Sequence, residues 1–367
     1  MSLKILHVSE PFASGTLEFM QELCFNLSKH NHVVLHGNRI SEQNIYAAQR
    51  GFHQRATFIA WEAVQREIHW FDDLKAAWQL IKVIRQEKPD IIHAHASKAG
   101  FLCRVFSRFF ACPVVYTPHA ISFLRLDISE RTKKFYIFLE KFAHALHKNP
   151  NFVACSGSEE RSIKKHIPKA KVFKINNGVK VRFVQGEQKE FPEVFTAEHP
   201  LVIVNAGVNN TQKNQERFFD IALSLHDELR VHFVWIGDTL PSSLVRCTGW
   251  LKHSSVIKNM RKSHVFLSTS LWEGLPLSAL EAMSVGLPLL LSNCSGHVDL
   301  VSRQLPNGKI WNSNSEVKKY IEDILENPAI LTTWSNNSLF LQKKYFNIYH
   351  CAKNYEIFYK QLLLEKH

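Results

Sequence analysis

Residues 268–292, STSLWEGLPLSALEAMSVGLPLLLS, decide how the rest of the chain is interpreted. An apolar run leads into this stretch and another ends it, and each predicts a buried strand. Between them Pro276 suits the first turn of a helix, and apolar residues then recur at helical spacing. The segment therefore predicts strand, loop, helix and strand, with Glu273 in the loop and Glu281 two turns into the helix.

The same alternation extends outward in both directions from this segment. Strands are predicted at 3–8, 32–36, 57–61, 90–95, 114–117, 151–156, 201–207, 232–237, 245–249, 264–270 and 288–292. Helical spacing fills the gaps, most clearly at 17–30, 72–87, 98–110 and 129–147. Strands that are apolar almost throughout and alternate with helices predict parallel sheets covered on both faces, so the fold class is α/β.

A polar stretch without a sustained period, at 181–200, interrupts this pattern and suits a domain boundary. We therefore expect a first doubly wound domain at 1–182 and a second one at 183–344. The last stretch, 345–367, is a further helix rich in Tyr, Phe and Leu. In two such domains ligand sites are expected after the carboxyl ends of strands, at a central cleft.

Composition excludes several classes of protein. The 367 residues, 45% of them hydrophobic, suffice for two domains with cores of their own. The seven cysteines are scattered and show no zinc or redox spacing, as is typical of buried thiols in a cytoplasmic protein. No apolar stretch reaches the length of a membrane span, and the chain enters a strand pattern without a signal-peptide pattern.

The net charge of +12 is concentrated in one region. Residues 98–182 hold seventeen Lys and Arg against five Asp and Glu, interleaved with large apolar residues. Phe101, Phe106, Phe109, Phe110, Phe123, Leu124, Phe135, Tyr136 and Phe138 are these apolar residues. Such a region favours an anionic membrane surface over an ordinary solvated face. Nucleic acid is not expected as a partner, because no motif of the usual nucleic-acid readers is present.

The loop before 277 has the chemistry of a phosphate and sugar site. Backbone N–H groups of Gly274, Leu275 and Leu277 would point outward at a helix N-terminus, which stabilises a diphosphate. Glu273 would accept hydrogen bonds from sugar hydroxyls, and Glu281 from a ribose. The spacing of the two carboxylates alone is weak, and the competing interpretation is a surface Glu near a helix start. The flanking apolar strands and the Gly-Pro loop favour the functional interpretation.

These residues, from Glu273 through Glu281 and on to EAMSVGLPLL, resemble the E-x7-E signature of the family 4 retaining glycosyltransferases. Other pieces follow in the expected order: ASG at 13–15, HAHASKAG at 93–100, TPHA at 117–120, SGSEE at 156–160, INNGV at 175–179, AGVNNTQKN at 206–214 and SGHVDLV at 295–301. The resemblance covers the chain from residue 1 to about residue 303. It implies the GT-B architecture of two Rossmann-like domains, with the terminal helix packing back onto the first.

The resemblance also implies roles for individual residues. In that family the first Glu contacts the donor sugar and the second holds the ribose, which are the positions of Glu273 and Glu281. Gly15 matches a glycine that lets the first loop approach the diphosphate. His119 matches a histidine that contacts the sugar near the reacting carbon, although a structural histidine at a strand end is the alternative. The nucleotide base is expected beside a segment that comprises Gly249, Trp250 and Leu251.

One position departs from the family pattern. The family has an Arg and then a Lys after the first strand of the second domain, and both stabilise the leaving diphosphate. Lys213 matches the Lys, whereas Val208 stands at the Arg position. The site thus lacks one expected cation, and a well-placed charge contributes several kcal/mol to such a transition state, on the order of 3 kcal/mol.

The sequence therefore predicts a retaining, metal-independent glycosyltransferase without a cofactor. No divalent metal site is expected, and His93 and His95 are interpreted as structural or partner-bonded. The donor is expected to be a UDP-sugar, with GDP and ADP donors left open. The acceptor is expected to be a lipid-linked glycan or lipopolysaccharide core at the cytoplasmic face of the inner membrane, in the biosynthesis of surface polysaccharide. The alternatives are a nucleotide-sugar epimerase of the same fold and a non-catalytic partner of another transferase.

Overall fold

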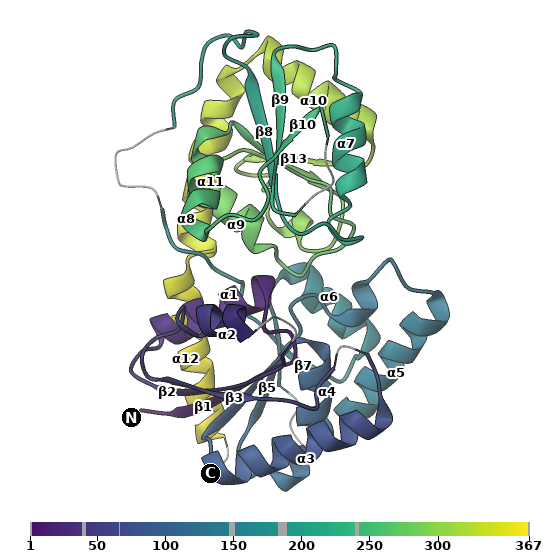
Figure 1. Cartoon of the computed structure of the whole chain (residues 1–367), viewed down its shortest axis with the longest axis vertical. Coiled ribbons are helices and arrows are strands. Elements are labelled where there is room, and N and C mark those ends of the chain that lie inside the picture. Colours follow the sequence, from purple (N-terminus) through teal and green to yellow (C-terminus); the bar gives the residue numbers. More distant parts are fainter. Residues whose placement is uncertain are drawn as a thin grey trace. The chain divides into compact units, whose positions relative to one another are not determined.

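The computed structural model describes residues 2–38, 42–65, 67–146, 151–182, 189–238 and 242–365. They form two compact units (Figure 1). Unit 1 comprises Met1–Leu124, Ile128–Asn177 and Ile348–His367, and unit 2 comprises Arg125–Asp127 and Gly178–Asn347. The contacts thus change unit after Asn177, whereas the sequence analysis places the domain boundary after residue 182.

In the described part of unit 1, parallel strands form one sheet in the order β3-β2-β1-β4-β5-β6-β7. They are β1 Lys4–Ser9, β2 Asn31–His36, β3 Ala56–Ala60, β4 Ile91–His95, β5 Val114–Thr117, β6 Asn151–Ala154 and β7 Lys171–Lys174. The first six were predicted. The sequence analysis missed β7, because its residues KVFK are half polar, as suits the edge strand of a sheet.

Helices cover both faces of this sheet. They are α1 Ser14–Asn26, α2 Glu42–Gln49, α3 Trp70–Glu87, α4 Ala96–Val105, α5 Glu130–Leu146, α6 Gly157–His166 and α12 Ile348–Leu364, with short 3-10 turns at Ser107–Phe109 and Ser122–Leu124. Helix α12, the last of the chain, packs beside α1, the first (Figure 1). Both ends of the described chain therefore contribute to unit 1.

The two faces of the unit 1 sheet differ in chemistry because successive side chains of a strand point to opposite faces. On one face Leu6, Val8 and Ile92 join the main apolar core. On the other face the strands place buried histidines, namely His7, His32, His93 and His95. These imidazoles lie towards α1 and α12, since Cys24 of α1 lies within 3.5 Å of His7 and Tyr359 of α12 bonds to His93.

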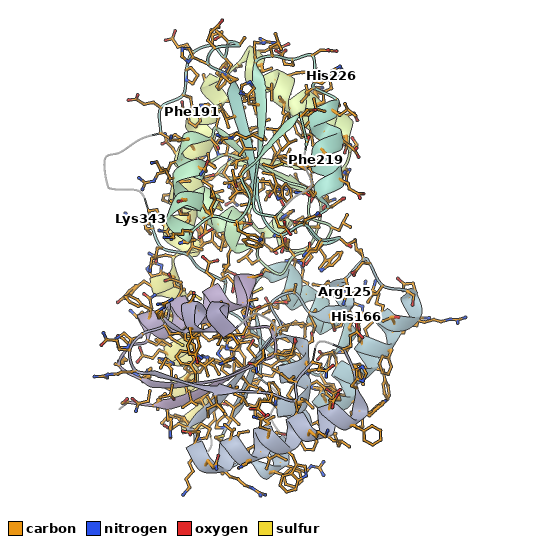
Figure 2. The ribbon with its side chains drawn as sticks, viewed as in Figure 1. Arg125, His166, Phe191, Phe219, His226 and Lys343 are labelled. Atoms are coloured by element: carbon orange, nitrogen blue, oxygen red, sulfur yellow. The ribbon has the colours of Figure 1, made fainter. Side chains whose placement is uncertain are left out.

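In the described part of unit 2 the sheet has the order β10-β9-β8-β11-β12-β13, again parallel. The strands are β8 Leu201–Ala206, β9 Val231–Ile236, β10 Val245–Cys247, β11 Val265–Ser268, β12 Leu289–Ser292 and β13 Gly308–Trp311. The helices are α7 Gln215–Leu223, α8 His253–Lys262, α9 Leu277–Ser284, α10 Asn314–Glu326 and α11 Ala329–Tyr345, with a 3-10 turn at His297–Asp299. Phe191 and Phe219 pack at the margin of the core (Figure 2).

The terminal helix begins later than the sequence analysis expected at 345. Helix α11 ends at Tyr345, and Phe346 and Asn347 form a connection before α12. This connection is tied to unit 2, because Phe346 accepts a hydrogen bond from the N–H of Val179 at 2.9 Å. The hydrogen bond between Val179 and Phe346 thus marks the break between α11 and α12, which the apolar pattern of the sequence does not reveal.

Both sheets follow the strand order of doubly wound dinucleotide-binding folds, which confirms the predicted α/β class. In each sheet the order reverses beside the first strand, between β1 and β4 in unit 1 and between β8 and β11 in unit 2. Loops that follow the carboxyl ends of these strands are the expected ligand positions. Among the described residues, no helix is long and apolar enough to cross a membrane.

Candidate functional site

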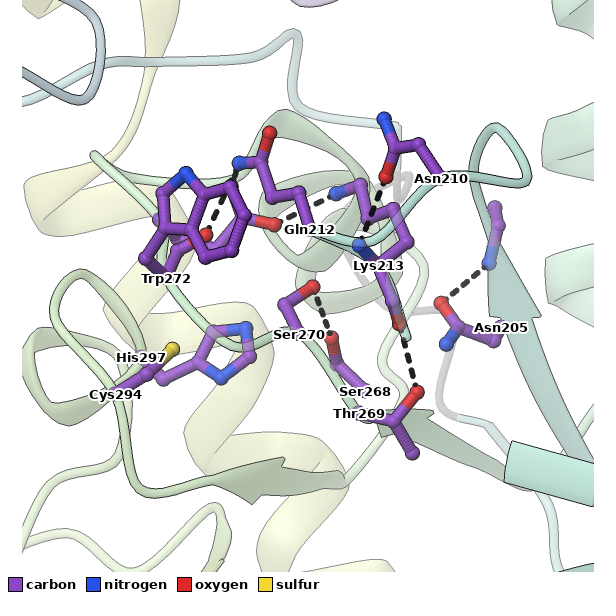
Figure 3. A network of polar contacts seen from close by, with 12 residues as sticks. Asn205, Asn210, Gln212, Lys213, Ser268, Thr269, Ser270, Trp272, Cys294 and His297 are labelled. Atoms are coloured by element: carbon purple, nitrogen blue, oxygen red, sulfur yellow. Dashed lines mark hydrogen bonds and ion pairs between the residues drawn. The ribbon is translucent and has the colours of Figure 1, made fainter. Parts of the chain in front are cut away.

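Two loops of unit 2 meet at the switch point of its sheet. Lys213 follows β8 and Glu273 follows the neighbouring β11, and Lys213 Nζ lies 2.7 Å from Glu273 Oε1. Gln212 Nε2 donates to the Trp272 carbonyl at 3.0 Å and to Glu273 Oε2 at 3.3 Å. Figure 3 shows Gln212 and Lys213 of the first loop beside Trp272 of the second. The structure thus brings together two residues that are sixty positions apart in sequence.

The backbone around Lys213 is held by short-range contacts. Asn210 Oδ1 accepts from the N–H of Lys213 at 2.9 Å, and Thr269 Oγ1 donates to the Lys213 carbonyl at 2.9 Å (Figure 3). The next residue, Asn214, has φ 49°, a left-handed conformation that asparagine tolerates better than most residues. The loop therefore holds its lysine before any ligand binds.

Charge in this loop pair is balanced. Burial by itself raises the pKa of Glu273. The charge of Lys213, the nearby His297 and hydrogen bonds from Lys213 and Ser270 together outweigh this effect and hold the pKa below its usual value. Glu273 is therefore ionised at neutral pH. An anionic ligand that attracts Lys213 must compete with this carboxylate, so the ion pair couples ligand binding to the position of Glu273.

A third loop, after β12, completes the surroundings of Glu273. Ser295 Oγ donates to the Glu273 carbonyl at 2.7 Å. The buried His297 donates from Nδ1 to the Ser292 carbonyl at 2.9 Å, and its Nε2 meets no hydrogen-bond partner among the described residues. Burial lowers the pKa of His297 to about 4, so this ring is neutral. Its Nε2 is then an acceptor beside the carboxylate.

Helix α9 begins directly after Glu273. Pro276 precedes it in an extended conformation, and Leu277 is its first residue. Gly274 and Leu275 are buried, whereas Leu277 is half-buried. The N–H groups of the first turn have no intrahelical acceptor, as at any helix start. Leu277 thus begins the helix, whereas Gly274 and Leu275 lie in the loop before it. Their role as phosphate donors stays a prediction.

Glu281, on α9, is buried and pairs with His253, the first residue of α8. The residues predicted to flank the base, Gly249, Trp250 and Leu251, come just before this helix. Gly249 has φ 65° and accepts from the N–H of Gly237 at 3.1 Å. Trp250 is 68% exposed, and Leu251 is half-buried. The structure therefore ties Glu281 to the segment that carries the predicted base contacts.

The other predicted site residues belong to unit 1. His119 follows β5 with φ 54°, and Ala120 follows with φ 79°; both conformations are strained for residues other than glycine. Buried Glu159 supports this turn, because its Oε1 accepts from the N–H groups of Ala120 and Ile121 at 2.9 and 3.0 Å. Its Oε2 accepts from the N–H of Cys155 at 2.9 Å. One carboxylate thus holds the His119 turn onto the start of α6.

The prediction that Gly15 lies in the loop after the first strand is wrong. The loop ends at Ala13, and Gly15 lies exposed in the first turn of α1. Ser14 takes the left-handed conformation there, with φ 53°, and lets the helix begin early. Val208 lies half-buried after β8 and supplies no charge to that loop. The predicted roles of Gly15 and Val208 remain predictions.

The sequence predicts no divalent metal site, and this stays a prediction. Among the described residues of unit 1, two groups of His and Cys side chains lie close enough together that they could hold a metal ion. His7 takes part in both, once with His93 and His95 and once with Cys24 and His32, and the ligand atoms of each group lie within 4.8 Å of one another. The interpretation of His93 and His95 as partner-bonded is confirmed. His93 bonds to Tyr359 and Thr117, at 2.7 and 2.8 Å, and His95 to His119 at 3.1 Å.

Four residues with evident structural roles were missed: Gln212, Glu159, His253 and His297. Gln212, Glu159 and His297 lie inside segments singled out for the family resemblance. The sequence could have indicated these three residues, because each is a polar residue in a segment that follows a predicted strand. Gln212, Glu159 and His253 have partners that lie 61, 39 and 28 positions away in sequence, and only the fold identifies these partners.

Most of the chain matches two known families. Residues 18–183 match the family described as Glycosyltransferase Family 4, and residues 186–339 match Glycosyl transferases group 1. The UDP-Gal:alpha-D-GlcNAc-diphosphoundecaprenol alpha-1,3-galactosyltransferase of Escherichia coli is 30% identical over 277 residues, 68% of this chain and 69% of that protein. The N,N'-diacetylbacillosaminyl-diphospho-undecaprenol alpha-1,3-N-acetylgalactosaminyltransferase of Campylobacter jejuni is 23% identical, over 72% and 75%.

Solved structures show the same fold. The sucrose-phosphate synthase of Thermosynechococcus elongatus has a TM-score of 0.79 at 15% identity, over 99% of this chain and all of that chain (100%). Anabaena Alr3699/HepE, in complex with UDP and glucose, has a TM-score of 0.78 at 14% identity, over 98% and 100%. The fold is therefore GT-B. Together with the sequence matches, this shows that the chain belongs to the family 4 glycosyltransferases.

Proposed function

We propose that the chain transfers a sugar from a UDP-sugar to a polyprenyl-diphosphate-linked glycan during the biosynthesis of a surface polysaccharide. Support comes from the two named relatives, which act on diphospho-undecaprenol-linked acceptors. The name of the first relative specifies a UDP-linked donor, and the structural neighbour from Anabaena holds UDP. The donor base and acceptor class in this proposal follow from those proteins.

The observation that carries the donor site is the Lys213–Glu273 pair beside the N-terminus of α9. In the proposed complex the ammonium of Lys213 and the N–H groups of Gly274, Leu275 and Leu277 stabilise the diphosphate. Glu273, freed from Lys213, accepts from the sugar hydroxyls, and Glu281 accepts from the ribose. The base lies against Gly249–Leu251. One ion pair thus separates into a phosphate contact and a sugar contact.

The transfer is proposed to retain the anomeric configuration and to need no metal. The family resemblance implies both, and both named relatives form α linkages, which an α-linked nucleotide sugar yields with retention. Glu273 orients the sugar and is not the nucleophile. The family resemblance also supports a role for His119 in contacting the sugar near the reacting carbon. With Val208 at the usual Arg position, Lys213 and the N-terminus of α9 stabilise the departing diphosphate.

Calorimetric titration of the full chain with UDP, GDP and ADP tests the donor site. We expect UDP to bind, and Glu281→Ala to weaken its binding about tenfold, since one charge-assisted hydrogen bond is lost. Glu316→Ala is the matched control, because Glu316 caps α10 instead and lies outside the proposed site. If the folded protein binds none of the three nucleotides, the proposal is contradicted. That result would favour the alternative in which the chain is a non-catalytic partner of another transferase.

Product analysis separates transfer from epimerisation. Incubation with a UDP-hexose and an undecaprenyl-diphosphate-linked sugar in detergent is expected to extend the lipid-linked sugar by one residue. Chelating agent in the buffer is expected to leave the rate unchanged. Conversion of the donor sugar without acceptor would instead show an epimerase.

We further propose that unit 1 binds the cytoplasmic face of a membrane. Helix α5 exposes Phe135, Phe138 and Phe142 on a surface that also carries Arg131, Lys134 and Lys141. A basic helix with aromatic residues suits an anionic lipid interface. Most of the apolar residues that motivated this prediction pack in the core instead, among them Phe101, Phe106 and Phe123. Their helices are amphipathic, so the apolar content overstated the exposed surface.

Helix α3 supplies a second exposed apolar surface in unit 1. Trp70, Phe71 and Trp78 are exposed by 74, 83 and 72%, together with Leu74, and Lys75 and Lys82 flank them. Aromatic residues exposed so fully on one helix are unusual in a protein that meets only water, whereas Trp favours the lipid headgroup region. The sequence analysis did not single out α3, because its basic region begins at Lys98.

Flotation with vesicles of phosphatidylglycerol and phosphatidylcholine tests this surface. Lys134→Glu together with Lys141→Glu is expected to lower partitioning at least about thirtyfold, since each basic residue contributes about 1 kcal/mol of attraction. Trp70→Ser together with Trp78→Ser is expected to lower it on anionic vesicles too. Lys309→Glu and Phe340→Ser, exposed in unit 2, are the matched controls. Equal flotation with neutral vesicles, or no effect of either pair, would contradict the proposal.

A further inference from the structure

Four imidazoles of unit 1 form a continuous hydrogen-bonded row that ends at His119. His32 Nδ1 lies 3.1 Å from His7 Nε2, His7 Nδ1 lies 3.1 Å from His95 Nε2, and His95 Nδ1 lies 3.1 Å from His119 Nε2. The far end meets the backbone, where His32 Nε2 lies 3.1 Å from the Leu27 carbonyl. Each contact joins one Nε2 to one Nδ1 or to a carbonyl oxygen. The hydrogen bonds of the row can therefore all run in the same donor-to-acceptor direction.

The carbonyl of Leu27 determines that direction. A carbonyl oxygen only accepts, so His32 Nε2 must carry the proton and donate. A neutral imidazole has one N–H, which leaves His32 Nδ1 to accept from His7 Nε2. In the same way His7, which donates from Nε2, must accept at Nδ1 from His95 Nε2, and His95 must accept at Nδ1 from His119 Nε2. His119 is therefore protonated at Nε2 and carries its lone pair on Nδ1.

The surroundings keep all four rings neutral. Burial lowers the pKa of His32 to about 4 and of His119 to about 3, and it lowers the pKa values of His7 and His95 well below their usual value. Phe19 and Cys24 of α1 cover the row on one side. Burial keeps Cys24 protonated by raising its pKa far above the usual value. Beside the row, His93 bonds to Tyr359 and Thr117 and takes no part in it.

We propose that His32, His7 and His95 are positioning residues that fix the tautomer of His119, so that its Nδ1 accepts a hydrogen bond from a hydroxyl group of the substrate. The opposite tautomer would donate from Nδ1 and would select a carbonyl or phosphate oxygen instead. That the hydroxyl belongs to the transferred sugar rests on the proposed function. The tautomer itself rests only on unit 1.

The row also explains the histidine groups with metal-ligand spacing. A bound metal would need lone pairs from His7 Nε2 and His32 Nδ1 or from a similar set, whereas the row uses His7 Nε2 as a donor. The two arrangements are therefore exclusive. Elemental analysis of the purified chain distinguishes them, and a stoichiometric transition metal would overturn the proposal.

Two-bond proton–nitrogen correlation NMR of the chain labelled with 15N-histidine reads each tautomer directly. We expect His32, His7, His95 and His119 each to be protonated at Nε2 and unprotonated at Nδ1 at neutral pH. His32→Leu removes the fixed end of the row and is expected to give a mixture of tautomers at His119. His32→Gln is expected to restore the single tautomer, because its amide can donate to Leu27 and accept from His7. His93→Gln, beside the row, is the control that leaves His119 unchanged.

Activity adds a second and separate measurement. His32→Leu is expected to lower kcat about tenfold without changing the Kd for UDP, and His32→Gln to recover it, because the lost contact is one hydrogen bond to substrate. A His119 that is protonated at Nδ1, or that is unaffected by His32→Leu, would refute the row's role. Correct tautomers in a chain without transferase activity would instead refute the proposed function and leave the row intact.

Discussion

Single residues that follow the ends of strands control the charge of the proposed donor site. In the Lys213–Glu273 pair the carboxylate is buried and the lysine half-buried, and the two residues lie in loops that follow neighbouring strands. A buried pair holds its loops together only while both charges are present, because either charge alone is poorly solvated. The pair is thus a stability element in the free protein and, in the proposed function, a ligand contact in the complex.

Replacing Lys213 by Met is expected to lower the free energy of unfolding of unit 2 by about 3 kcal/mol, because the carboxylate of Glu273 stays buried without its cation. Adding Glu273→Gln should recover part of this loss. Urea unfolding of both single variants and the double variant measures the coupling between the two residues. A Lys213→Met variant as stable as the wild-type chain would show that the pair contributes nothing.

The same pair predicts a pH dependence. The pKa of Glu273 is lower in the folded chain than in the unfolded one, so its contribution to stability is present above the unfolded value of about 4.3. The contribution is lost as pH falls through the folded value. The stability difference between wild type and Glu273→Gln should be constant near neutral pH and shrink below about pH 4. Urea unfolding across that range measures it, and a difference that grows on acidification would contradict the sign.

Glu159 offers a second test at this scale. Glu159→Gln replaces one oxygen that accepts from backbone N–H groups by an amide that donates, and we expect a loss of about 2 kcal/mol of stability in unit 1. The strained turn of His119 should relax, which lowers kcat while the Kd for UDP stays unchanged. Glu160→Gln, the neighbour whose partner is the exposed Lys164, should change neither quantity.

At the scale of elements, close backbone approach between loops positions Glu273. Gly296, with φ 80°, lies where an added Cβ would come within 2.7 Å of the Gly274 carbonyl oxygen and 3.0 Å of Glu273 Cβ. The loop after β12 therefore presses directly on the loop after β11. A side chain at position 296 must move one of the two.

Gly296→Ala is expected to cost more stability than Gly249→Ala. Both glycines have positive φ, so both substitutions carry a backbone cost of about 1 kcal/mol. At Gly249 an added Cβ meets nothing within 4 Å, whereas at Gly296 it meets backbone. We expect Gly296→Ala to be the worse by at least about 1 kcal/mol in thermal unfolding. Equal losses would mean that the loops shift freely.

At the scale of the whole molecule, unit 1 is assembled from both ends of the chain. Helix α12 buries Tyr355, Phe358 and Tyr359 in unit 1, although it follows all of unit 2 in sequence. Its tyrosines also bond to His93 and Thr117. The fold of unit 1 is therefore complete only after the last helix has formed.

A chain that ends at Asn347 is expected to lose the structure of unit 1 and keep that of unit 2. Without α12 the histidine face of the sheet meets water, and the buried area of three aromatic side chains is lost, at about 2 kcal/mol each. Hydrogen exchange should show lost protection in β1 and β4 and retained protection in β8 and β11. Full protection of β1 and β4 in the shortened chain would contradict this.

The sequence by itself determined the fold class, eleven of the described strands and the family, because apolar period and motif order are local properties of the chain. It also placed Glu273 and Lys213 after strand ends and Glu281 in the helix that follows Glu273. It missed β7 and β13, which are short edge strands with polar residues. It also placed Gly15 in a loop, whereas α1 already begins at Ser14, which has a left-handed conformation.

Only the tertiary structure decided which of these residues meet. Three contacts join residues that lie on different strands or in the loops and helices that follow them. They are the contact of Lys213 with Glu273, the support of the His119 turn by Glu159, and the row from His32 to His119. The sequence shows each polar residue but not its partner, because a partner is set by strand order and register in the sheet. The tautomer of His119 is decided in the same way. It depends on the carbonyl of Leu27 at the end of α1, which is connected to His119 only through histidines on β2, β1 and β4.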